Sequence, residues 1–187
     1  MTLDKMLVFD TETGGLNNST DALMSVTMKV VGEPENIKTW FIKEQRNLNY
    51  NDKALEVNGI TLEYLEENGI TEAACIGEIV SFIKVNYKDK PIPLGQNIGF
   101  DIDFINQLFT RNNMHSFVSM LHYKKRDTQQ VSNFLRDCGV EMESTKLGDA
   151  YKFFTGKDML NAHTSEADVI ATEALYDAQI AYVKERL

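Results

Sequence analysis

The first fifty residues contain short apolar and β-branched runs that predict three strands. Residues 6–9 (Met-Leu-Val-Phe) form a continuous apolar run, which is typical of a strand buried on both faces. Residues 22–31 and 37–42 favour two further strands, and the Gly-Glu-Pro-Glu-Asn sequence at 32–36 has the composition of a hairpin loop. Because the links are short, the pattern predicts an antiparallel meander.

Beyond residue 50 the apolar residues recur at helical spacing. Thr61 is expected to cap a helix that Gly69 ends, and Gly59 is expected to end the helix before it. A short strand is predicted at 91–95. The helices are predicted at 51–58, 61–68, 71–85, 100–112, 128–138, 146–154 and 165–186. Strands followed by helices around one more strand indicate an α/β domain with a mixed sheet.

The length of 187 residues predicts a single domain, 1–187. Nothing approaches the ~20 apolar residues of a membrane span, and residues 6–9 are too short for a signal-peptide core. Cys75 and Cys138 lie far apart without metal-site spacing, so we expect two buried free thiols. The expected location is the cytoplasm, without a membrane partner.

The net charge of −9 conflicts with nucleic-acid binding, because phosphate contacts normally come from Lys and Arg. Either the protein binds no nucleic acid, or its acids hold divalent cations that meet the phosphates. The basic run at 124–126 (Lys-Lys-Arg) favours the approach of a strand, although a solvated loop explains it equally well.

Asp10 and Glu12 follow the first predicted strand, and alternation along an extended chain points both carboxylates to one side. Two carboxylates there repel each other, and a divalent cation held by oxygen ligands would neutralise them. Gly14 and Gly15 would let a backbone or a ligand come close. The competing interpretation is an acid that caps a turn at the strand end.

Two later segments add acids. Asp101 is expected in the first turn of a helix, where negative charge is favourable, and Asp103 on the helix surface. His163 precedes the last predicted helix, and Asp168 lies in its first turns beside Ile170, on a face expected to pack against the protein. The competing interpretations are a helix-start acid and a capping or core histidine. Together, four carboxylates and one His match a two-cation phosphodiesterase in which the His accepts a proton from water.

Three motifs resemble those of the DnaQ-like exonucleases with the Asp-Glu-Asp-Asp-His signature. They occur in the family's order, and a Val-Asn-Gly-Ile-Thr segment at 57–61 is similar to one that many members carry between the first two. The motifs are Val8-Phe9-Asp10-Thr11-Glu12-Thr13-Gly14-Gly15-Leu16, Gly95-Gln96-Asn97-Ile98-Gly99-Phe100-Asp101, and His163 with Asp168 and Ala171-Thr172.

The resemblance implies an RNase H-like fold, with helices on both faces of a mixed sheet, and 3′-to-5′ exonuclease activity. It makes Asp10, Glu12, Asp101 and Asp168 the ligands of two Mg²⁺ or Mn²⁺ ions and His163 the general base. It further implies substrate contacts from Thr11, whose backbone would face the terminal sugar, from Leu16, which would sit under the terminal base, and from Asn97.

Two departures from the family pattern leave the proposed ligands intact. Gly14 replaces a Thr, and Ser25-Val26-Thr27-Met28 stands where several members have an acidic residue and a Gly. We expect these changes to affect substrate preference. The expected partner is a single-stranded nucleic acid 3′ end, the expected activity is on DNA in proofreading or repair, and a polymerase is a further candidate partner. The alternatives are an RNA-trimming exonuclease and a catalytically idle binding module.

Overall fold

The computed structural model describes residues 6–159 and 164–187. Its five-stranded sheet has the order β3-β2-β1-β4-β5. The strands are β1 (Met6–Thr13), β2 (Leu23–Val30), β3 (Ile37–Phe41), β4 (Ile92–Gly95) and β5 (Arg126–Asp127). The β1–β2 and β2–β3 pairs are antiparallel, as the meander predicted, and β4 and β5 add in parallel.

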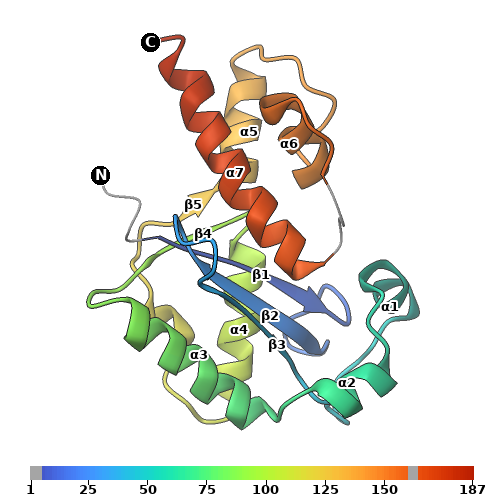
Figure 1. Cartoon of the computed structure of the whole chain (residues 1–187). Coiled ribbons are helices and arrows are strands. Elements are labelled where there is room, and N and C mark those ends of the chain that lie inside the picture. Colours follow the sequence, from blue (N-terminus) through green and yellow to red (C-terminus); the bar gives the residue numbers. More distant parts are fainter. Residues whose placement is uncertain (1–5, 160–163) are drawn as a thin grey trace.

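Seven α-helices and one short 3-10 helix complete the described chain (Figure 1). They are α1 (Asp52–Asn58), α2 (Leu62–Asn68), α3 (Glu72–Asn86), α4 (Gly99–Arg111), η2 (Phe117–Met120), α5 (Thr128–Asp137), α6 (Leu147–Thr155) and α7 (Ser165–Lys184). The predicted caps are confirmed, because the Thr61 hydroxyl accepts from Tyr64 N and Gly59 ends α1 with φ of 65°. The sequence did not predict η2 or β5, since two to four residues are too few to show a period.

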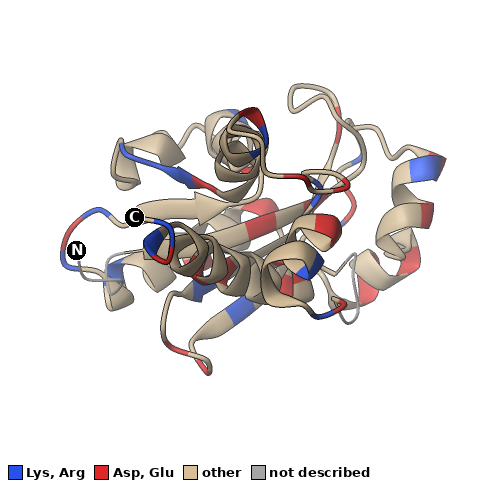
Figure 2. Cartoon of the chain, turned by 90° about the horizontal axis from the view of Figure 1, so that it is seen from above, with Lys and Arg blue, Asp and Glu red and all other residues tan. Residues whose placement is uncertain are grey.

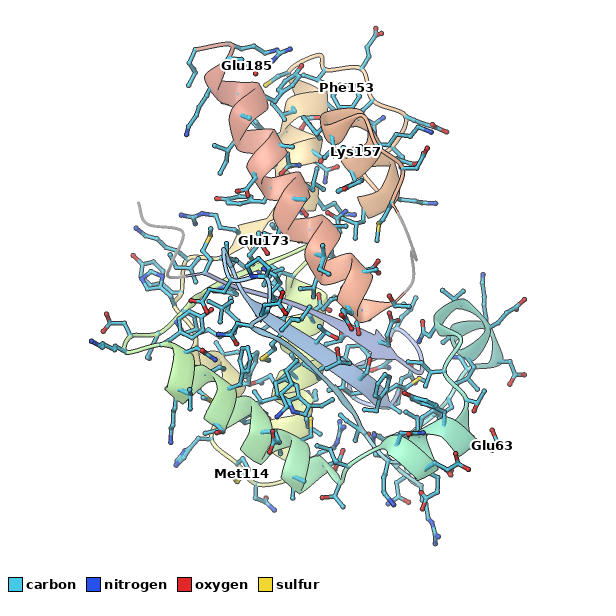
Figure 3. The ribbon with its side chains drawn as sticks, viewed as in Figure 1. Glu63, Met114, Phe153, Lys157, Glu173 and Glu185 are labelled. Atoms are coloured by element: carbon cyan, nitrogen blue, oxygen red, sulfur yellow. The ribbon has the colours of Figure 1, made fainter. Side chains whose placement is uncertain are left out.

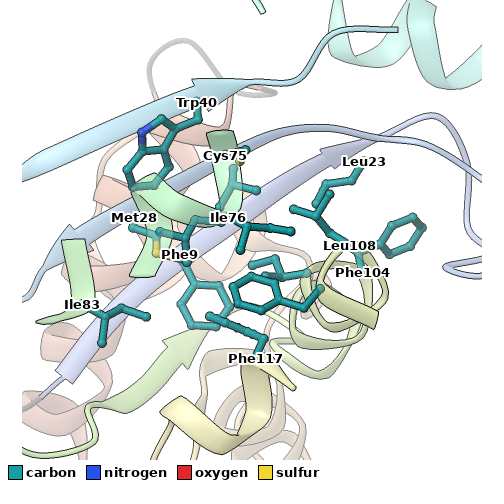
Figure 4. Packing of buried hydrophobic residues seen from close by; sticks show 14 of the residues in the cluster. Phe9, Leu23, Met28, Trp40, Cys75, Ile76, Ile83, Phe104, Leu108 and Phe117 are labelled. Carbon is teal, nitrogen blue, oxygen red and sulfur yellow. The ribbon is translucent and has the colours of Figure 1, made fainter. Parts of the chain in front are cut away.

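β1 lies at the centre of the sheet, and its side chains alternate between two apolar layers. Leu7 and Phe9 belong to the core formed with α3, α4 and η2, whereas Met6 and Val8 pack with Val169 of α7. Helices therefore cover both faces of the mixed sheet, as predicted (Figure 1). Phe9 meets the Phe117 ring edge-on at 5.8 Å within the larger core (Figure 4).

Helix α7 is joined to the sheet by polar contacts as well as apolar ones. The Lys29 ammonium of β2 forms a buried ion pair with Glu173, which projects from α7 toward the sheet (Figure 3). Glu173 also accepts a hydrogen bond from Gly32 N at 2.7 Å. These contacts hold the middle of α7 against the β2–β3 hairpin and so orient its first turn.

Two expectations need correction. β1 does not end at Phe9 but continues to Thr13, because β2 pairs with it through Asp10 and Glu12. Cys75 is buried as expected, but Cys138 is exposed, because it follows the last turn of α5 at the surface. Within the described ranges, no helix has both the length and the apolarity needed to cross a membrane.

The buried position of Phe9 predicts a large loss of stability on truncation. Phe9→Ala should lower the free energy of unfolding by about 3–5 kcal/mol, because it removes a buried ring and leaves a cavity. The matched change at an exposed ring, Phe134→Ala, should alter it by no more than about 0.5 kcal/mol. Urea denaturation of both variants checks this, and equal losses would contradict the assignment of Phe9 to the core.

Candidate active site

The two acids of β1 lie on the face that α7 covers. Asp10 and Glu12 continue the alternation of Met6 and Val8, so their side chains point toward α7. Pairing of β1 with β4 stops at Val8, whereas pairing with β2 continues. The second half of β1 therefore has a backbone neighbour on one side only, which leaves room on the other for α4.

Helix α4 brings Asp101 into this space. A turn after β4 places Asn97 in the left-handed region (φ 56°), which Asn tolerates better than most residues. Asp101 then lies in the first turn of α4, 3% exposed, and its Oδ1 accepts a 2.7 Å hydrogen bond from the Thr11 hydroxyl. Asp103 is exposed on the same helix, as the sequence predicted.

Helix α7 supplies the last acid from its first turn. Thr164 caps the helix by accepting from Ala167 N, and Asp168 lies one turn further on. The buried Ser165 hydroxyl is hydrogen-bonded to that of Thr27 at 2.7 Å, and Thr27 to Thr39 at 2.8 Å. The hydroxyls of β2 and β3 therefore anchor the turn that carries Asp168.

These elements bring three carboxylates within reach of one cation. Oxygen atoms of Asp10, Glu12 and Asp168 all lie within 4.8 Å of one another. Asp101 is outside this closest group but near enough to repel Asp10. Oxygen-only donors of this kind suit hard divalent cations such as Mg²⁺, Mn²⁺ or Ca²⁺.

Burial, together with repulsion between carboxylates, raises the pKa of Asp10, Glu12 and Asp101. The pKa of Asp10 lies well above its usual value, because of burial first and then repulsion by Asp101, Glu12 and Asp168. The same causes raise the pKa of Glu12 to about 8, with Asp168 the strongest neighbour. Burial raises the pKa of Asp101 to about 7 although the Thr11 hydrogen bond opposes it. A bound cation would remove this penalty, so the donor set fits a divalent metal.

A cleft of about 780 Å³ opens beside Glu12, over β2 and β3. Its apolar wall includes Phe41, Ile60, Tyr64 and Ile170, and the rings of Phe41 and Tyr64 meet edge-on at 5.0 Å. Ile170 is half-exposed on this wall, so the expectation that its helix face packs against the protein is wrong at that position. The cleft has the size and apolar lining of a small-ligand site.

The other predicted site residues have different surroundings. The Leu16 side chain is 87% exposed, and Asn97 is exposed at the start of α4. Thr11 is buried, and its hydroxyl holds Asp101. The predicted general base, His163, lies outside the described residues. Gly14 and Gly15 do allow close approach, because a Cβ on Gly14 would lie 2.5 Å from the Asn49 carbonyl oxygen.

Sequence reasoning missed Asp127. Its carboxylate caps α5 by accepting from Gln129 N and Gln130 N, and it also accepts from Asn97 N at 3.0 Å. Its charge raises the pKa of Asp101. An Asp directly before a predicted helix is a cap signature, so the local role was detectable, but the link to Asp101 was not.

A known family covers most of the chain: residues 7–176 match the RNase_T family, described as exonuclease. The chain belongs to this exonuclease family. The match includes all four acids and confirms the resemblance to DnaQ-like exonucleases. Membership of the subgroup with a catalytic His stays a prediction.

The chain is similar in fold to solved structures of E. coli exonuclease I. The complex of that protein with a dT13 oligonucleotide has a TM-score of 0.76 and 24% identity, covering 97% of this chain and 41% of the other. The complex with a dA16 oligonucleotide gives 0.77 and 25% over the same shares. A zinc-bound complex with single-stranded DNA gives 0.75 and 22%, again over 97% and 41%. The chain thus spans about two fifths of those chains, and the predicted RNase H-like fold is confirmed.

The raised pKa values predict that the metal-free protein loses stability as pH rises. The folded chain holds the Glu12 proton more tightly (pKa about 8) than an unfolded chain does (4.5). The contribution of the Glu12 proton to the free energy of unfolding is therefore complete below pH 4.5 and is lost as pH rises from 4.5 through 8. The loss amounts to a few kcal/mol, since one pKa unit corresponds to about 1.4 kcal/mol.

Urea denaturation with a chelator at pH 5 and pH 8 measures this loss. Glu12→Gln should reduce the pH dependence, because the amide cannot ionise. Glu63→Gln, which changes an exposed acid on α2, should leave it as in the wild type (Figure 3). A wild-type pH dependence in Glu12→Gln would contradict the site electrostatics.

Proposed function

We propose that residues 1–187 act as one exonuclease domain that removes nucleotides from the 3′ end of a DNA strand and releases nucleoside 5′-monophosphates. The observation that carries this proposal is the convergence of Asp10, Glu12 and Asp168 within 4.8 Å, with Asp101 beside them, in a member of an exonuclease family. Exonuclease I, with which it shares a fold, has been solved in complex with DNA oligonucleotides.

In this proposal, Asp10, Glu12, Asp101 and Asp168 hold two divalent cations, Mg²⁺ or Mn²⁺. When bound, the cations neutralise the phosphodiester and stabilise charge on the attacking and leaving oxygens. The Thr11 hydroxyl fixes the rotamer of Asp101, and the hydroxyls of Thr27 and Thr39 fix the start of α7. The ligands are thus positioned before substrate arrives, which limits the reorganisation that the reaction requires.

The cleft beside Glu12 accepts the terminal nucleoside. Its apolar wall can contact a base, and its hydroxyls can bond a sugar. Two acids, Glu12 and Glu166, lie on it, and none of its described lining residues is Lys or Arg. A cleft without Lys or Arg side chains suits one nucleoside better than a chain of phosphates. His163, directly before the cap of α7, is proposed as the base that takes a proton from the attacking water.

Digestion of 5′-labelled oligomers tests this activity. Wild-type protein with Mg²⁺ should shorten the DNA from its 3′ end into a ladder, whereas early release of the labelled mononucleotide would contradict the polarity. An RNA oligomer of the same sequence decides between DNA and RNA trimming, because the two sugars differ by one 2′-hydroxyl.

Asp10→Asn should lower turnover by orders of magnitude, because the amide lacks the negative charge that would hold the proposed cations. The fold should be kept, because Asn has nearly the same shape as Asp. The matched control is Asp103→Asn, an equal change at an exposed acid of α4, which should digest DNA at the wild-type rate. Wild-type turnover in Asp10→Asn would exclude Asp10 as a metal ligand.

Thermal melting of Asp10→Asn separates the enzyme from an idle binding module without any substrate. Mn²⁺ at a hundred times its Kd should stabilise the wild type by about 2.7 kcal/mol, or roughly 5–10 °C in Tm. The metal-free variant should melt above metal-free wild type, since one repulsive charge is gone, and should gain little from Mn²⁺. Equal shifts in the two proteins would contradict the proposed site.

His163→Ala should lower the rate by ~10²–10⁴-fold, the usual contribution of a general base. Wild-type activity should rise with pH through the His titration near ~6.5, and the variant should lose that limb. The measurement is single-turnover hydrolysis from pH 5 to 8. An unchanged pH profile would make His163 a structural residue.

A further inference from the structure

A second hollow, of about 570 Å³, lies on the opposite side of β1 from the cleft beside Glu12. It is formed by the start of α4, by β5 and by α5, and we name it the basic hollow. Its lining includes Asn97, Gly99, Lys125, Arg126, Asp127 and Phe134. Because β1 is central in the sheet, the acids that it carries lie between the two openings.

The basic hollow begins beside the proposed metal ligands. Gly99 is two residues from Asp101, and a Cβ at Gly99 would lie 3.5 Å from Lys125 Nζ. Asp127 lies in the hollow, bonds Asn97 N, and is close enough to raise the pKa of Asp101. A chain of phosphates that leaves the acids on this side therefore meets the Lys125 ammonium early.

The charge of this surface contrasts with that of the chain as a whole. The net charge is −9, yet Lys124 and Lys125 are exposed and adjoin Arg126. In Figure 2 this run is a continuous blue stretch of ribbon that leads into β5. Such a local reversal of sign suits a phosphate chain, whose binding depends on neutralisation by Lys and Arg.

Exposed aromatic rings flank the basic run. Phe134 is 65% exposed on α5 and lines the hollow, and Tyr123 is 83% exposed beside Lys124. Lys124 Nζ lies 5.7 Å from the centre of the Tyr123 ring. Exposed rings next to cations are the combination on which single-stranded nucleic acids stack their bases. A duplex would present phosphates but no free base faces, so the pattern favours a single strand.

We propose that the basic hollow holds the strand upstream of the scissile phosphate, with Lys125 against its phosphates and Phe134 stacked on a base. This proposal rests on the proposed function. It assigns the two openings different contents: the cleft beside Glu12 takes the terminal nucleoside, and the basic hollow takes the remainder of the chain. The enzyme then retains the strand between successive cuts through contacts that are absent from the cleft.

The test compares a substrate that has an upstream strand with one that lacks it. The first is a 12-nucleotide single-stranded DNA, and the second is the p-nitrophenyl ester of thymidine 5′-monophosphate, in which nitrophenolate replaces the upstream strand. Phe134→Ala should lower kcat/KM for the DNA roughly 5- to 100-fold, the range of one base stacking on a ring. Lys125→Gln should lower it in a salt-dependent way, with a log–log salt slope shallower by about 0.7 for each phosphate that Lys125 neutralises in the wild type.

Both variants should hydrolyse the ester as the wild type does. Lys84→Gln, which removes an equal charge from the exposed side of α3, is the matched control and should leave both substrates unaffected. Equal losses with DNA and ester would overturn the proposal, because the residues would then act at the reacting centre or on the fold. Unchanged DNA hydrolysis in both variants would overturn it as well.

A binding measurement separates this proposal from the proposed function. In an Asp10→Asn background, fluorescence anisotropy of the labelled oligomer reports strand binding without hydrolysis. If wild-type protein cuts neither substrate, the proposed function fails, and the binding arm still decides on the hollow. Weaker binding on adding Phe134→Ala or Lys125→Gln supports the strand path, and unchanged binding contradicts it.

Discussion

Asp10, Glu12, Asp101 and Asp168 repel one another at the point where three elements distant in sequence meet. Burial is the larger cost and repulsion adds to it, so the ionised forms of Asp10, Glu12 and Asp101 are unfavourable in the folded chain without a counter-charge. Folding must oppose this cost with packing elsewhere. Apolar layers on both faces of β1 provide that packing, and the strand that carries the repulsive charges is itself almost wholly buried.

The placement of α7 decides whether the fourth acid reaches the others. Its first turn is held by the hydroxyls of Thr27 and Ser165, and its middle by the ion pair of Lys29 and Glu173. The Ser25–Met28 segment, where the chain departs from several DnaQ-like exonucleases, supplies the hydroxyls of this contact. The departure therefore acts on the position of Asp168 and on the cleft, which Ser25 lines, rather than on a metal ligand.

The two sides of β1 differ in charge, which reconciles the net charge of −9 with the polyanionic substrate that we propose. The cleft over β2 and β3 has apolar and hydroxyl side chains and two acids but no Lys or Arg among its described lining residues, whereas the basic hollow near β5 has Lys125, Arg126 and the exposed ring of Phe134. The acids between them attract cations rather than phosphates. The net charge of the chain is therefore a poor guide to where phosphates could bind, because the central strand lies between the acidic cleft and the basic hollow.

Local patterns in the amino-acid sequence were sufficient to establish the order and type of the long elements, since apolar periodicity and cap residues are local signals. They also established that Asp10 and Glu12 share a face, because alternation follows from the extended backbone. Tertiary contacts were needed to show that β1 extends to Thr13, that the Thr11 hydroxyl holds Asp101, and that Asp127 acts on Asp101 from β5. They were needed as well to place Ile170 on a cleft and Lys125 against Gly99. Each of these features depends on contacts between residues far apart in the chain, and no local pattern carries that information.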